Sequence, residues 1–121
     1  MKALEVYLKT AWALKTPLVF LLDSKYKIPY FEAIESISLK FSYMADYSDC
    51  DDAAVQYKAE ASKRFLNAVG IVFGFYHGQL HLWNMAITKR VSGAESVHQI
   101  EPQSKYVFKW NKHYRPILVI I

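Results

Sequence analysis

Several features that define whole classes of protein are scarce or missing in this chain. Cys50 is its only cysteine, which excludes a disulfide within the chain and metal sites made of thiolates alone. The only four glycines, at positions 70, 74, 78 and 93, form no phosphate-binding or dinucleotide-binding loop. The apolar run at 17–22 is too short for a signal peptide or a membrane span. We therefore expect a soluble, cytoplasmic protein with no membrane contact and no cofactor.

The residues that are abundant indicate one well-packed domain. Of the 121 residues, 53% are hydrophobic and 16% are aromatic, which excludes a disordered chain and predicts a single globular domain over 1–121. The net charge is +4, with acidic residues concentrated in 23–60 and basic residues in 61–121. Because these two regions can attract each other, the positive charge is only weak evidence for nucleic acid as a partner.

Hydrophobic periodicity predicts both helices and strands. Expected helices cover 3–15, with Leu4, Leu8 and Trp12 on its apolar face, and the region from about 49 to Gly70. Expected strands cover 35–43, a hairpin of 71–76 and 80–88, then 105–110 and 116–121, with a further short strand at 96–100. Residues 18–22 and 30–36 remain open between helix and strand. The fold class predicted is α+β, a single mostly antiparallel sheet of about five strands with two or three helices on one face.

The C-terminal segment has no polar residue, which predicts that a strand there is covered on both faces. This segment consists of Ile117, Leu118, Val119, Ile120 and Ile121. If the helices cover one face, a second copy of the chain can cover the other, and we predict a homodimer that self-associates through these five residues. A first helix that crosses the second face would serve equally well.

The residues able to carry catalysis give no recognisable motif. Cys50 stands at a predicted helix N-terminus, which lowers a thiol pKa, but the neighbouring aspartates raise it, so an inert thiol is the favoured interpretation. His77 and His81 flank the predicted hairpin turn and are interpreted as polar residues near a turn, rather than metal ligands. We therefore predict no catalytic residues and no metal site, and a non-enzymatic protein is favoured over an enzyme.

The segment 105–115 alternates basic and aromatic residues. As one strand it would place most of the basic side chains on one face and Tyr106, Phe108 and Trp110 on the other. Single-strand binders need bases to stack on aromatics that share a face with basic residues, so nucleic-acid binding is a minor alternative. Its expected contacts are Lys105, Lys109, Lys112 and Arg115.

The order of elements resembles that of the cone-shaped α+β domains of the nuclear-transport-factor-like type. That resemblance implies a curved sheet around an apolar ligand pocket, with the possible lining residues Tyr57, Phe65, Phe73, Trp83 and Trp110. The favoured interpretation is that the same residues fill a closed core.

No motif names a reaction, so the function remains unknown at this level. The favoured hypothesis is a small non-enzymatic domain that acts by self-association or by binding a protein partner. The alternatives are a pocket for a small apolar ligand and nucleic-acid binding through the basic C-terminal segment.

Overall fold

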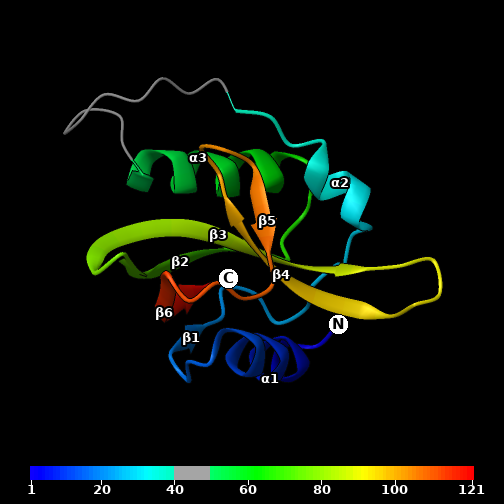
Figure 1. The fold of residues 1–121 in the computed structure, drawn as a ribbon. Coiled ribbons are helices and arrows are strands. Elements are labelled where there is room, and N and C mark those ends of the chain that lie inside the picture. The colour runs from blue at the N-terminus through cyan, green and yellow to red at the C-terminus, as the bar shows by residue number, and fades with distance from the viewer. Residues whose placement is uncertain (40–49) are drawn as a thin grey trace.

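A six-stranded sheet lies between helices on its two faces, with α1 below it and α2 and α3 above it in the view of Figure 1. The computed structural model describes residues 1–39 and 50–121, the side chain of Cys50 excepted. The elements are α1 (Ala3–Leu14), β1 (Val19–Phe20), α2 (Phe31–Glu35), α3 (Cys50–Lys63), β2 (Val69–Tyr76), β3 (Gln79–Lys89), β4 (Glu95–Glu101), β5 (Tyr106–Phe108) and β6 (Tyr114–Ile120). The strand order is β1-β6-β2-β3-β4-β5.

The predicted fold class was wrong in strand number, in strand direction and in the placement of the helices. The sheet is mixed because β1 runs parallel to β6, with Val19 beside Val119 and Phe20 beside Ile120. Backbone bonds from Val119 N to Leu18 O at 2.8 Å and from Ile121 N to Phe20 O at 2.9 Å secure this pair. The chain turns back after α1, so the short segment before Leu22 can pair with the tail. Helices on both faces also exclude the cone-shaped alternative.

The C-terminal strand β6 is an interior strand of the sheet, between β1 and β2. Val119 and Ile121 are fully buried in one cluster with Val6 and Leu14 of α1. On the other face the cover is incomplete, because Leu118 is half-buried and Ile117 is 39% exposed. The first helix therefore covers one face of the C-terminal strand. The burial of this strand no longer gives a reason to expect the predicted homodimer.

The opposite face of the sheet is covered by α3. Tyr57 and Ala61 of this helix are buried against the sheet, and Asn84 Nδ2 of β3 donates to the Ala54 carbonyl at 2.9 Å. The helix ends at Lys63, and Phe65 adopts a φ of 59°, well before the predicted stop at Gly70, which lies inside β2. The helix and the following hairpin are thus confirmed, but the helix boundary is wrong.

The predicted strand at 35–43 was also wrong over the residues that the structure describes. Residues 31–35 form α2 and residues 36–39 belong to no strand, while residues 40–43 lie outside the described part of the chain. The helical spacing of Phe31 and Ile34 after Pro29 prevails over the period of two, since Ile34 and Ile37 both pack in the cluster beneath α3.

The buried hydroxyl of Tyr57 should make the free energy of unfolding fall at alkaline pH. Its hydroxyl donates to the Ile34 carbonyl at 3.3 Å, and burial raises the pKa of Tyr57 to about 12. An unfolded tyrosine ionises near pH 10, so between pH 10 and 12 the unfolded state releases this proton first and the free energy of unfolding falls by roughly 2 kcal/mol. Urea unfolding across this range should show a smaller decrease for Tyr57→Phe than for the original protein. Tyr30→Phe, at an exposed position, is the matched control; equal decreases in both variants would contradict the assignment.

Candidate functional site

A histidine and a glutamate from neighbouring strands form a short hydrogen bond at one end of the sheet. His81 lies near the start of β3 and Glu101 is the last residue of β4. His81 Nε2 lies 2.7 Å from Glu101 Oε2, and the two side chains are only 14% and 9% exposed. Such a contact fixes the imidazole ring in one orientation.

The carboxylate of Glu101 is only partly satisfied by its surroundings. Tyr114 OH donates to Oε2 at 3.2 Å, whereas Oε1 is buried with no hydrogen-bond partner in the part of the chain that the structure describes. Burial raises the pKa of Tyr114, and the negative charge of Glu101 raises it further, so the phenol stays a donor. A buried carboxylate oxygen that accepts no hydrogen bond lowers the stability of the fold. Such unsatisfied groups are typical of functional sites, where a ligand can supply the donor.

Aromatic rings enclose the imidazole of His81. The ring centroids of Tyr76, Trp83 and Tyr114 lie 5.5, 5.8 and 6.2 Å from that of His81. Trp83 is itself held in place, because its Nε1 donates to Gln99 Oε1 at 2.9 Å. These rings limit the motion of the imidazole and lower the local dielectric, which strengthens its bond to Glu101.

One ring nitrogen of His81 remains available for a further hydrogen bond. His81 also lies on a part of β3 whose outer edge is unpaired. Nδ1 of His81 has no hydrogen bond among the described residues, while Nε2 is occupied by Glu101. β3 pairs with β2 from Gln79 onward, but it pairs with β4 only from Asn84 onward. The outer edge of residues 79–83 therefore has no strand partner in the described structure.

The only thiol of the chain belongs to the first turn of the helix that packs over β3. Cys50 begins α3, four residues before Ala54, whose carbonyl is bound by Asn84. Four helical residues span about 6 Å. Figure 1 shows that α3 begins over the end of the sheet where the β2–β3 hairpin lies, which is also the end that carries His81. His81 itself shares the parity of Trp83, on the sheet face away from α3.

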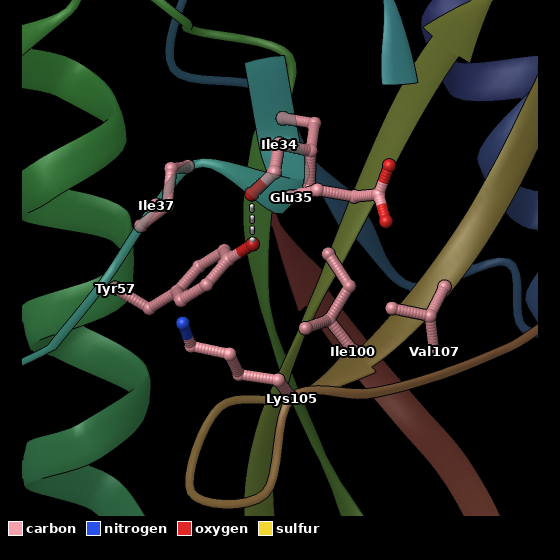
Figure 2. Close-up of a pocket in the computed structure, with 7 residues that line it drawn as sticks. All are labelled: Ile34, Glu35, Ile37, Tyr57, Ile100, Lys105 and Val107. Carbon is pink, nitrogen blue, oxygen red and sulfur yellow. Dashed lines mark hydrogen bonds between the residues drawn. The ribbon is translucent and has the colours of Figure 1, made fainter. Parts of the chain in front are cut away.

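A separate small cavity lies between α2, α3 and the strands β4 and β5. It measures about 110 Å³ and is lined by Ile34, Glu35, Ile37, Tyr57, Ile100, Lys105 and Val107. Figure 2 shows the Tyr57 hydroxyl bonded to the Ile34 carbonyl and the Lys105 side chain extending toward the Tyr57 ring. The cavity is too small for a drug-sized ligand, which needs roughly 300 Å³ or more.

The five aromatic residues predicted to line one ligand pocket are not brought together. Tyr57 borders the small cavity, whereas Trp83 is buried on the opposite face of the sheet. Phe65 and Trp110 are 82% and 46% exposed, and Phe73 is half-buried in β2. The sheet itself separates these side chains, so they do not form a common pocket.

The four predicted basic contacts are also dispersed, apart from one pair. Lys105 borders the cavity of Figure 2, and Lys109 is exposed beyond β5. Lys112 and Arg115 line a surface groove together with Trp110. The segment 105–115 is not a single strand, because β5 ends at Phe108 and β6 begins at Tyr114.

Two further properties hold for the described residues. They contain no cluster of three or more His, Cys, Asp or Glu side chains with the geometry of a metal site. They also contain no helix with the length and apolarity that crossing a membrane requires.

Two solved structures share this fold. A complex of PSL1a with E64 matches with a TM-score of 0.74 at 22% sequence identity, over 98% of this chain and 48% of that one. The lectin of Polyporus squamosus bound to Neu5Acα2-6Galβ1-4GlcNAc, a human-type influenza-binding epitope, matches with a TM-score of 0.78 at 21% identity, over 100% of this chain and 49% of that one. The chain thus spans about half the length of each. No protein-family model and no curated protein matches its sequence.

Proposed function

We propose that the protein is a thiol-dependent hydrolase of peptide bonds, with Cys50 as the nucleophile, His81 as the general base and Glu101 as the group that orients the imidazole. The hydrogen bond of 2.7 Å between His81 and Glu101 is the observation that carries this proposal. A nucleophile, a base and an orienting carboxylate are the three roles that recur in acyl-transfer enzymes.

In the proposed reaction His81 Nδ1 takes the proton of the Cys50 thiol, and the thiolate attacks the carbonyl carbon of the scissile peptide bond. The imidazolium then gives this proton to the leaving amine as the C–N bond breaks, which leaves a thioester on Cys50. A water molecule, deprotonated by His81, hydrolyses the thioester and restores the thiol. Glu101 accepts a hydrogen bond from His81 Nε2–H throughout, which leaves Nδ1 for the proton transfers.

The open edge of β3 supports a peptide as the substrate. Residues 79–83 leave backbone groups on the outer edge without a strand partner in the described structure. An extended peptide can add to such an edge through main-chain hydrogen bonds, and this would place its carbonyl groups beside His81. α3 packs on the sheet face opposite to the one that carries Trp83 and His81. The proposed reaction therefore requires that the first turn of α3 move relative to this edge.

The comparison with solved structures adds chemical support. E64 is the compound named in one of these complexes. It carries an epoxide ring, which a thiolate can open to form a covalent thioether. Since that chain is about twice as long as this one, its complex supports the proposal only in combination with the His81–Glu101 pair.

The experiment is incubation of the protein with E64, followed by mass spectrometry of the intact chain and its peptides. We expect one adduct on Cys50 in the original protein, formed at least about tenfold more slowly in His81→Ala, because a neighbouring imidazolium stabilises the thiolate. His77→Ala, on the same hairpin, is the control. Equal labelling of the original protein and His81→Ala would overturn the proposal.

A second candidate is glycan binding, which the lectin complex with the sialylated trisaccharide favours. The exposed rings near the hairpin, Tyr76, His77 and His113, offer flat faces on which a sugar ring can pack. A glycan array probed with the labelled protein tests this candidate. Binding of sialylated glycans that is lost in Tyr76→Ala and kept in Cys50→Ala would favour the lectin function over the hydrolase.

A further inference from the structure

A basic groove lies next to the His81–Glu101 pair and belongs to neither the sheet edge nor the small cavity. It measures about 350 Å³, and its lining includes Lys15, Trp110, Lys112, Tyr114, Arg115 and Pro116. Three of these residues are cations and none is acidic. In the described structure no carboxylate forms an ion pair with any of the three. The groove therefore presents uncompensated positive charge.

The chain adopts a strained backbone at the rim of this groove. Lys15, the residue that ends α1, has a φ of 53°, a left-handed conformation that favours glycine. Its ammonium group lies 4.4 Å from the centre of the Trp110 ring. This cation–π contact holds the positive charge of Lys15 over the groove.

Tyr114 connects the groove to the candidate catalytic pair. Its ring is part of the groove wall, and its hydroxyl donates to Glu101 Oε2 at 3.2 Å. The groove and the carboxylate are thus separated by one phenol side chain. The ring centroid of Tyr114 lies 6.2 Å from that of His81, so a ligand in the groove would lie close to a peptide held beside His81.

From this geometry we infer that the groove is a specificity subsite for a peptide substrate with an acidic side chain, Asp or Glu, close to the scissile bond. The inference rests on the proposed hydrolase function. The carboxylate of the substrate lies among Lys15, Lys112 and Arg115, and its aliphatic part lies against Trp110. The Trp110 indole and the cations line the same groove. In the predicted single strand over 105–115, most of the basic side chains would have lain on the opposite face from this indole.

The test compares two internally quenched peptides that differ only in one Glu-to-Gln change two residues from the scissile bond. We expect kcat/KM for the Glu peptide to exceed that for the Gln peptide by about tenfold at low salt, and this preference to decrease as salt rises. The double variant Lys15→Gln, Lys112→Gln should remove the preference, whereas Lys27→Gln, Lys63→Gln, which removes the same charge from exposed positions elsewhere, should keep it.

Two results separate a failure of this inference from a failure of the proposed function. Cleavage of both peptides at equal rates would overturn the acidic subsite and leave the hydrolase intact. If neither peptide is cleaved, the binding of the Glu peptide to Cys50→Ala still tests the groove, followed through the change in tryptophan fluorescence that the additional substitution Trp110→Phe should abolish. Binding of a single-stranded oligonucleotide there, with no binding of the Glu peptide, would overturn the inference in favour of nucleic acid.

Discussion

Val119→Asp is expected to leave the protein largely unfolded at room temperature. Val119 is fully buried in β6, an interior strand, and it packs in the cluster that includes Val6 and Leu14 of α1. An aspartate there would place an ionisable group without a polar partner in an apolar site, at a cost of several kcal/mol. Since small domains are stable by only about 5–15 kcal/mol, this loss removes most of the stability.

Leu118→Asp is the matched control, one residue away on the opposite face of the same strand. Leu118 is only half-buried, so the new carboxylate keeps contact with water and should cost about 1 kcal/mol. Urea unfolding followed by circular dichroism measures both variants. Equal tolerance of the two substitutions would contradict the burial of the tail under α1.

Cys50→Ser and His81→Ala should each lower kcat/KM for peptide hydrolysis by at least about 1,000-fold. General base catalysis and an activated nucleophile each contribute at this scale, and groups that act as one unit are strongly non-additive. The double variant should therefore be scarcely less active than either single variant. Steady-state kinetics with a quenched peptide substrate provides the measurement.

His77→Ala separates a catalytic effect from a structural one. His77 lies at the hairpin turn, where its ring stacks on His113 with centroids 4.2 Å apart, and it makes no contact with Glu101. This variant should keep the activity of the original protein, and all variants should keep its circular dichroism spectrum. Full activity in His81→Ala would exclude the imidazole from the reaction.

The sequence predicts the elements of this fold well where local patterns and burial agree. The helix at 3–15 and the hairpin around His77 follow from periodicity and turn chemistry, and both are confirmed. The buried face of that helix is different from the predicted one, because Val6, Thr10 and Leu14 are buried while Leu4 and Trp12 are 68% and 87% exposed. Spacing alone identifies a helix but does not decide which of two apolar stripes meets the core.

The site depends on contacts between distant segments, which sequence patterns do not encode. His81 and Glu101 stand twenty residues apart, and only the register of β3 on β4 brings their side chains into contact. The available signal was the chemistry of the residues together with their places in the strands, since His81 lies near the start of one strand and Glu101 ends another. The parallel pairing of β1 with β6 depends likewise on segments about one hundred residues apart.

The alkylation of Cys50 by iodoacetamide as a function of pH tests the central claim most directly. An ordinary thiol, with a pKa of about 8.5, is almost fully protonated at pH 6 and reacts slowly there. A thiolate paired with the imidazolium of His81 should still react rapidly at pH 6, and His81→Ala should restore the pH profile of an ordinary thiol. An ordinary profile in the original protein, unchanged in His81→Ala, would contradict a catalytic pair of Cys50 and His81.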